Sequence, residues 1–403
     1  MTEIILSFEE ARRTVEREAA KINVGAQVPL RAALIESQIR VLAEDVVADR
    51  DLPPFPRSTR DGYAVRSADG AGRLKLIGEI RAGITGDLPQ VGPGECVAIM
   101  TGAPLPPGAD AVIMIEYTSL QGTSVSLQRA VTKGENVVPQ GAEAKQGSVL
   151  LQEGTKLTPA ALAVAASAGK SELKVFERPK VAILSTGDEL VEINQQPQQF
   201  QIRNSNSYSL AAQITAAGGE PLILAIAADD TPRLRELIEK GLKADLLLLS
   251  GGVSMGKHDL VEPVLRDLKA EFFFTGAKIQ PGKPVVFGKA REKYFFGLPG
   301  NPVSTLVTFH LFAKQLVEAL SGAAPQPLRF LQARLKSVIN VKPGLTRFLP
   351  ATLSGEFDRT EVQLVKWQGS GDVVSAAKAD CYIVVSETGS QLAAGSAVNV
   401  LLI

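Results

Sequence analysis

The strongest chemical signal in the chain lies in residues 250–259, Ser-Gly-Gly-Val-Ser-Met-Gly-Lys-His-Asp. An apolar run at 245–250 leads into Gly251 and Gly252, and a segment with a helical pattern begins at Asp259. A strand that passes through a glycine loop into a helix directs free backbone N–H groups and the positive end of the helix dipole at one point. The sequence therefore predicts a site for a phosphate-type anion.

The same loop approaches the spacing of a nucleotide-binding P-loop, with Gly251, Gly256 and Lys257. The next residue is His258, whereas a P-loop needs Ser or Thr there to hold Mg²⁺. A nucleotide triphosphatase is therefore excluded. What remains is an anion site with the carboxylate of Asp259 at its edge.

Carboxylates follow the ends of three apolar runs that are expected to be strands. They are Glu189, Asp229 with its neighbour Asp230, and Asp259. Because ligands of an open α/β sheet bind at the carboxyl ends of its strands, we expect these acids to converge. Carboxylates around an anion loop suit a Mg²⁺–phosphate site, since Mg²⁺ prefers oxygen ligands.

Each acid also has a purely structural interpretation. Asp259 and Glu262 have the spacing of a capping box, so Asp259 either only caps its helix or caps it and also binds the metal. Asp229 and Asp230 could be solvated loop residues, and Glu189 could be a surface acid after a glycine turn. Their expected convergence at one sheet edge favours the functional interpretation.

Other turns could hold donors or acids in place. Lys283 lies between prolines in residues 280–284, where the backbone has little freedom. Residues 298–304 enter a helix with free N–H groups, and residues 101–110 form a Gly/Pro loop. Asp61 precedes a glycine, which taken alone is a turn signal before it is a catalytic aspartate. Tight-turn architecture explains each motif taken singly.

Composition limits both chemistry and partners. A chain of 403 residues is too long for one core and predicts about two to four domains. Its 43 basic and 43 acidic side chains balance, and no basic block occurs, which argues against nucleic acid as a partner. With only two histidines, His258 and His310, any acid, base or metal chemistry is expected to use carboxylates and lysines.

The cellular context follows from the cysteines and the apolar runs. Cys96 and Cys381 fit no metal-binding spacing and are expected to be buried thiols of a reduced cytoplasmic protein. The first ten residues are acidic where a signal peptide would be basic. No apolar run reaches the length of a membrane span, so no membrane partner is expected.

The expected elements predict an α/β plus β multidomain protein. An amphipathic helix at 7–23 opens the chain, and short strands and turns fill 50–140. A helix begins at Pro159, with Thr158 as its cap. Strands alternate with helices from 179 to about 322, which predicts a doubly wound parallel sheet. The tail, 326–403, is expected to be a small β-barrel or sandwich.

Six motifs between residues 50 and 305 occur in a fixed order. They are Asp61-Gly-Tyr-Ala, Ile99-Met-Thr-Gly-Ala-Pro, Ser185-Thr-Gly-Asp-Glu-Leu, Ser250-Gly-Gly-Val-Ser, Pro281-Gly-Lys-Pro and Leu298-Pro-Gly-Asn-Pro-Val-Ser. The fourth motif continues to Asp259 with one further glycine. Taken together, they resemble the molybdopterin molybdenumtransferase family, which includes bacterial MoeA and the E domain of gephyrin.

The resemblance implies a domain organisation and a reaction. A discontinuous linker domain (1–50 with 141–178) would precede and follow a mostly β domain (51–140). An α/β molybdopterin-binding domain (179–324) and a β-barrel (325–403) would complete the chain. The implied enzyme is a homodimer that inserts molybdate into adenylylated molybdopterin with Mg²⁺-dependent release of AMP. Its implied protein partners are the molybdopterin adenylyltransferase and molybdoenzyme chaperones.

The resemblance also implies site residues. The implied catalytic residues are Asp61, Glu189, Asp229, Asp259 and Lys283. The implied metal ligands are Asp229, Asp259 and Glu189. The implied binding residues are Thr101, Ser250, Gly251, Gly252, Ser254, Lys278, Pro299, Gly300, Asn301, Pro302 and Ser304. Arg347 and Ser375 are further candidates for the oxyanion.

The chain departs from the family pattern at two positions. Glu143 stands where an aspartate is common, and Gln280 stands where many members have a lysine. Lys278 lies two residues earlier, on the same face if the segment is a strand, and could supply the missing charge. The structural alternative is a solvated surface lysine. A non-catalytic molybdopterin-binding scaffold and a tungstate-inserting relative are the alternative functions.

Overall fold

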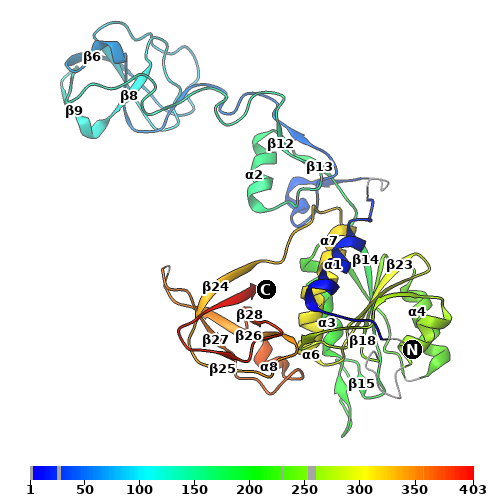
Figure 1. Ribbon diagram of the computed structural model, residues 1–403. Helices are drawn as coiled ribbons and strands as arrows, with labels where there is room; N and C mark the ends of the chain where they lie inside the picture. The colour runs from blue at the N-terminus through cyan, green and yellow to red at the C-terminus, as the bar shows by residue number, and fades with distance from the viewer. Residues whose placement is uncertain (1–2, 25–28, 229, 253–259, 357) are drawn as a thin grey trace. The chain divides into compact units, whose positions relative to one another are not determined.

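The computed structural model describes residues 3–24, 29–228, 230–252, 260–356 and 358–403 (Figure 1). The chain divides into two compact units. Unit 1 comprises Met1–Ala43, Gly154–Thr158 and Leu173–Ile403, and unit 2 comprises Glu44–Glu153 and Pro159–Glu172. A chain of this length was expected to form more than one core, and the two units agree with that expectation.

A mixed sheet forms the centre of unit 1. Its strand order is β17 (Glu220–Ile223), β14 (Lys180–Ser185), β18 (Leu246–Ser250), β23 (Lys293–Leu298), β22 (Val286–Ala290) and β19 (Glu271–Phe274). The first four strands are parallel, as predicted. Strand β22 is antiparallel to both of its neighbours, β23 and β19, which corrects the expectation of a wholly parallel sheet. The reason is local: Arg291 and Glu292, both with positive φ, form a two-residue turn that can join only antiparallel strands.

Helices cover both faces of this sheet, so the predicted doubly wound architecture is confirmed (Figure 1). One face carries α1 (Phe8–Ala19), α3 (Ser205–Ala216), α6 (Pro302–Thr308) and α7 (Lys314–Leu320), with a π-helical turn at Phe309–Ala313 between the last two. The other face carries α4 (Thr231–Gly241) and α5 (Val261–Asp267). The run of leucines in β18 serves both faces, because alternate side chains point to opposite sides.

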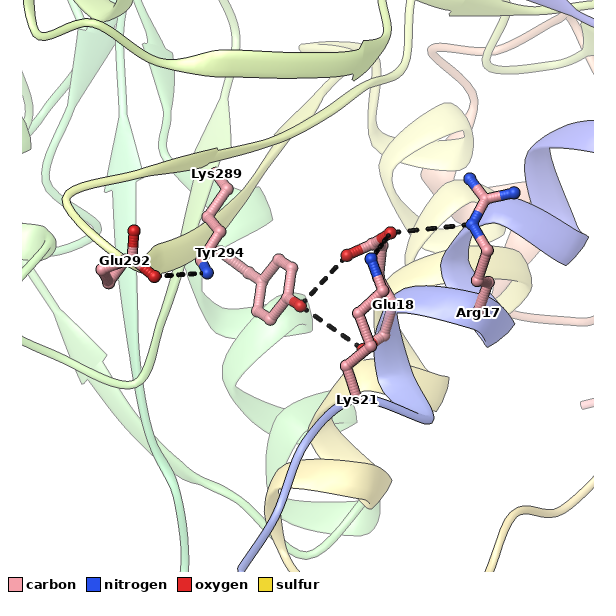
Figure 2. Close-up of polar contacts among 6 residues, drawn as sticks. All are labelled: Arg17, Glu18, Lys21, Lys289, Glu292 and Tyr294. Carbon is pink, nitrogen blue, oxygen red and sulfur yellow. Dashed lines mark hydrogen bonds and ion pairs between the residues drawn. The ribbon is translucent and has the colours of Figure 1, made fainter.

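The amino-terminal helix α1 packs on the α/β layer of its own chain. Ser7 and Glu10 form a capping box at its start, and the Phe8 ring lies edge-on to Phe348 at 5.0 Å. At its other end Glu18 is buried, and Tyr294 of β23 points its hydroxyl at the Glu18 carboxylate, at 3.3 Å (Figure 2). Lys21 lies 2.7 Å from the same carboxylate. These contacts fix both ends of α1.

The carboxyl-terminal region forms a closed β-barrel, as predicted. Its strands are β24 (Phe330–Leu335), β26 (Thr346–Ser354), β27 (Glu361–Leu364), β28 (Cys381–Val385) and β30 (Ala397–Leu402). They pair in the order β26, β27, β24, β30 and β28, and the pairing of β28 with β26 closes the ring. The short strand β21 (Ile279–Gln280) adds to β26 and ties the barrel to the α/β layer.

Unit 2 is mostly β, as residues 50–140 predicted. Its described sheet has the order β8 (Ala111–Met114), β5 (Gly62–Val65), β7 (Glu95–Ile99), β6 (Arg73–Ile80), β10 (Ser124–Leu127) and β9 (Thr118–Gln121). Helix α2 (Pro159–Ser167) begins at the expected proline.

Both cysteines are buried and unpaired, as expected. Burial raises the pKa of Cys96 to about 11 and that of Cys381 to about 12, which keeps both thiols protonated and unreactive. Among the described residues, no helix combines the length and the apolar character needed to cross a membrane.

We expect Tyr294→Phe to lower the free energy of unfolding by about 1–3 kcal/mol at pH 7, because the buried Glu18 loses a donor. Burial, followed by the negative charge of Glu18, raises the pKa of Tyr294 to about 12. The folded state therefore holds this proton more tightly than the unfolded state does. The resulting stability is complete below pH 10 and is lost as the pH rises through 12.

Urea unfolding followed by circular dichroism at pH 7 and between pH 10 and 12 checks both effects. The alkaline loss of stability should be smaller in Tyr294→Phe than in the wild type. Tyr208→Phe, at a tyrosine that is 43% exposed, is the matched control and should change neither quantity. Identical curves for the wild type and Tyr294→Phe would contradict a role for this contact.

Candidate functional site

Three parallel strands of unit 1 end at the same level. Ser185 of β14 pairs with Ser250 of β18, which pairs in turn with Leu298 of β23. From β14 the chain passes through α3 to β17 on one side, and it then returns through α4 to β18 on the other side. The sheet therefore has a topological switch point between β14 and β18, which is where ligands of such sheets bind. The loops predicted to carry chemistry leave from these ends. The region at the ends of β14, β18 and β23 is called the crevice below.

Glycines allow these loops to approach one another closely. A Cβ on Gly251 would lie 2.7 Å from the carbonyl oxygen of Thr186, and one on Gly252 would lie 2.6 Å from Thr186 Oγ1. Both glycines have positive φ, at 90° and 61°. A Cβ on Gly300 would lie 3.4 Å from Gly251 Cα. Side chains at positions 251 and 252 would force the strand ends apart, so the glycines are a steric requirement.

Polar side chains at the start of α3 lie beside these loops. Asn204, Asn206 and Ser207 are together called the polar wall. Asn204 is its N-cap and accepts from the Ser207 N–H at 3.2 Å. The buried hydroxyl of Ser185 lies 3.1 Å from Asn204 Oδ1 and 2.9 Å from Ser207 Oγ. Asn206 donates from Nδ2 to Ser250 Oγ at 2.9 Å and to the Gly300 carbonyl at 2.8 Å.

Sequence reasoning missed this wall. It assigned no role to Asn204 or Asn206. The available signal was Asn204 three residues before Ser207, which is the spacing of an N-cap with its acceptor. Nothing in the sequence indicated that Asn206 would reach Ser250 and Gly300.

Two buried atoms of this region have no described hydrogen-bond partner. They are Thr186 Oγ1 and Asn206 Oδ1. Leaving such an atom unpaired costs about 1–3 kcal/mol, so each is a place where a ligand could supply the missing partner.

The loop after β23 leads into α6 as the sequence predicted. Pro299 is buried, Asn301 is the N-cap residue and Pro302 is the first residue of the helix. The side chain of Asn301 donates to Ser370 Oγ at 2.9 Å, which anchors a barrel loop at the start of α6. Ser304 is buried in the first turn of α6.

A cationic group of residues lies where β21 meets the barrel. Gln280 is in register with Arg347 of β26, and Lys278 forms an ion pair with Glu387 at 3.3 Å. Lys283 is exposed, and a Cβ on the preceding Gly282 would collide with Thr308, so this turn packs on α6. Ser375 lies in the short helix α8 (Val373–Ala376), whose N-cap residue Asp372 accepts from the Ser375 N–H at 3.0 Å.

In unit 2, Asp61 faces Thr101. The Asp61 carboxylate accepts from the Thr101 N–H at 2.7 Å and from the Thr101 hydroxyl at 2.9 Å. The N–H bond is the larger cause, and together they hold the pKa of Asp61 below its usual value. Glu143, one of the two departures, forms an exposed ion pair with Arg57 at 2.7 Å.

The predicted metal ligands are only partly described. Asp229 and Asp259 lie outside the described residues, and so does Ser254, which was predicted as a binding residue. Glu189 is exposed after β14, with its carboxylate folded against Gly187. No group of three or more His, Cys, Asp and Glu side chains gathers among the described residues. The atoms of the crevice that could bind a metal are carboxylate, hydroxyl and carbonyl oxygens. Such oxygens fit a hard cation such as Mg²⁺.

Two neighbouring acids have structural roles. Asp230 is the N-cap of α4 and accepts from the Arg233 N–H at 2.9 Å. At α5 the N-cap residue is Leu260, and no described side chain caps the helix. Glu262 accepts from Arg266 Nε at 2.9 Å, and its expected capping-box partner Asp259 lies outside the described residues.

The crevice of unit 1 thus combines hydroxyls and an amide beside a separate cationic group. Such a set can bind a molecule with a polar heterocycle and an anionic portion, and it has no nucleophile paired with a base among the described residues of the crevice.

Family models cover most of the chain. Residues 6–169 match the MoeA N-terminal region (domains I and II), residues 182–319 match a probable molybdopterin-binding domain, and residues 332–403 match the MoeA C-terminal region (domain IV). The α/β crevice lies within the second match and the barrel within the third.

Individual relatives agree with these matches. The chain is 34% identical to a molybdopterin molybdenumtransferase of Staphylococcus aureus, over 94% of this chain and 93% of the relative. It is 35% identical to one of Bacillus subtilis, over 92% and 89%. A solved structure of a molybdopterin biosynthesis MoeA protein from Pyrococcus horikoshii has a TM-score of 0.70 and 33% identity, and it covers 99% of both chains. The chain therefore belongs to the MoeA family of molybdopterin molybdenumtransferases.

Proposed function

We propose that the protein inserts molybdenum from molybdate into adenylylated molybdopterin. Water cleaves the phosphoanhydride bond of the substrate to give AMP and the pterin phosphate, and the two dithiolene sulfurs bind molybdenum as their protons leave with a molybdate oxygen as water. The observation that carries the proposal is the crevice at the switch point of unit 1, built from glycine-lined loops within the matched molybdopterin-binding domain. Membership of a family of transferases supports the reaction type.

The two polar regions suit different parts of the substrates. The start of α6 after β23, with the Ser250 hydroxyl, is suited to the molybdopterin portion and its phosphates. Lys283, with Lys278 and Arg347, is suited to the molybdate dianion, because fixed cationic donors bind tetrahedral oxyanions. Thr101 with Asp61, and Ser304 near the start of α6, complete the expected set.

Mg²⁺ is part of the proposal, with Glu189, Asp229 and Asp259 as the residues that would hold it. The ion would neutralise the phosphate charge that develops as AMP leaves. The support is the oxygen atoms of this region and the exposed carboxylate of Glu189, which lies close to Gly187 in the loop after β14.

We further propose a cytoplasmic homodimer in which Asp61 of one subunit acts at the crevice of the other. Family membership supports this assembly, and the buried, unpaired thiols support a reducing compartment. The proposed domains are 1–50 with 141–178, 51–140, 179–324 and 325–403. The adenylyltransferase that makes the substrate and the chaperones that take the product are the proposed protein partners.

The direct test incubates the protein with adenylylated molybdopterin, Mg²⁺ and molybdate and measures AMP together with molybdenum bound to the pterin. We expect both products in equal amounts. Tight binding of the substrate without AMP release would contradict the enzyme and indicate a scaffold. Preferential use of tungstate in a competition between the two oxyanions would indicate the tungstate-inserting alternative.

We expect Thr101→Val to raise the pKa of Asp61, because the variant loses the hydroxyl donor and keeps the N–H donor. A lowered pKa keeps Asp61 ionised as the pH falls. If ionised Asp61 supports the reaction, the acidic limb of the pH profile for AMP release should therefore move to higher pH in the variant. Thr123→Val, at an exposed threonine of unit 2, serves as the control. An unmoved acidic limb would show that the charge of Asp61 does not matter.

We expect Lys278→Ala to raise the molybdate concentration needed for half-maximal insertion by about tenfold, the scale of one charge-assisted hydrogen bond. Gln280→Lys should lower that concentration. Glu387→Gln should also lower it, because it releases Lys278 from an exposed ion pair that is worth at most about 1 kcal/mol. Lys336→Ala, which breaks an exposed ion pair with Glu361 elsewhere on the barrel, is the matched control. An unchanged molybdate dependence in all three variants would leave Lys278 a surface lysine.

A further inference from the structure

Asn206 joins two loops of the crevice. It lies in the first turn of α3, and its Nδ2 donates to Ser250 Oγ of β18 at 2.9 Å and to the carbonyl oxygen of Gly300 at 2.8 Å. Both loops are otherwise held by close glycine contacts and by the Gly251 N–H to the Leu298 carbonyl at 3.1 Å. One side chain therefore links the end of β18 to the loop that follows β23.

The orientation of the amide is fixed by its partners. The carbonyl oxygen of Gly300 can only accept a hydrogen bond, so the NH₂ group must face it. The Oδ1 atom consequently points away from Gly300, where it is buried and no described residue donates to it. Asn204, two residues earlier on the same helix, differs in this respect, since its Oδ1 accepts from the Ser207 N–H. The unpaired atom is thus specific to Asn206 and is not a general feature of this helix start.

The same bond orients Ser250. Because Ser250 Oγ accepts from Nδ2 of Asn206, its own O–H is left to donate in another direction. Ser250 thus retains a hydroxyl donor, and Asn206 retains a buried amide acceptor with no described partner.

The chemistry of the acceptor selects its ligand. An amide oxygen cannot donate, so it repels phosphate and molybdate oxygens and attracts N–H groups. A pterin ring carries such N–H donors. Resting on the proposed function, we propose that Asn206 is a positioning and specificity-determining residue, whose Nδ2 sets the spacing of the Ser250 and Gly300 loops and whose Oδ1 accepts an N–H of the pterin. Since Oδ1 is enclosed in the free protein, pterin binding is accompanied by movement of the side chains around it.

The experiment measures the affinity of molybdopterin and of AMP, separately, for the full-length protein and for three variants. Asn206→Ala removes both functions of the amide. It should weaken molybdopterin binding by about tenfold or more and leave AMP binding within twofold. Ser205→Ala, at an exposed residue of the same helical turn, should change neither affinity. The melting temperature of each variant reports on folding.

Asn206→Asp provides a readout that a merely structural role would not move. An ionised carboxylate at this position would face the Gly300 carbonyl and repel it, whereas the protonated acid can donate to it as the amide does. Such a buried carboxyl has a raised pKa. Molybdopterin affinity in this variant should therefore be lost at pH 8 and recover as the pH falls towards 5, while the wild type changes little.

Equal losses of molybdopterin and AMP affinity in Asn206→Ala, or a defect in Asn206→Asp that does not depend on pH, would overturn the inference. If the wild type bound molybdopterin and both Asn206 variants bound it equally well, this inference would be overturned and the proposed function would stand. A wild-type protein that bound no molybdopterin would overturn the proposed function and this inference together.

Discussion

The level alignment of Ser185, Ser250 and Leu298 is the constraint on which the rest of the α/β layer depends. It places three strand ends side by side, and each must then release its loop into the same small space. Glycines at 251, 252 and 300 make this possible, since a Cβ at either of the first two would meet Thr186 at less than 3 Å. The crevice is therefore a consequence of strand register combined with the absence of side chains.

The remaining elements of unit 1 hold that register. Leucines of β18 alternate between two apolar clusters, so helices on both faces fix the strand from above and below. Helix α1 packs against the same layer. Its Phe8 ring contacts Phe348 of the barrel, and its Glu18 carboxylate accepts from the Tyr294 hydroxyl (Figure 2). The barrel reaches the same region through Ser370 at the start of α6 and through β26 beside β21. Packing far from the crevice thus determines how precisely its loops are placed.

Polar groups in this region divide into two kinds. Hydroxyl and amide groups line the crevice at Ser185, Ser250 and Asn206, whereas positive charge gathers at Lys278 and Lys283 near the barrel. A heterocycle needs directional donors and acceptors, and an oxyanion needs fixed charge. This division would suit the proposed transfer of molybdenum from an oxyanion to a pterin, and it needs no histidine.

The sequence by itself determined the order of elements and the loops that matter. Periodicity identified α1 and the alternation of strands and helices, and glycine next to the leucine run of β18 predicted a loop for an anion, because these signals are local. It could not determine the antiparallel pairing of β22 with β23 and β19 or the ion pair of Lys278 with Glu387, which is 109 residues away. Nor could it indicate that Asn206 reaches Ser250 and Gly300. Contacts between residues distant along the chain arise only when strand register and helix packing bring them together, and no local pattern encodes that distance.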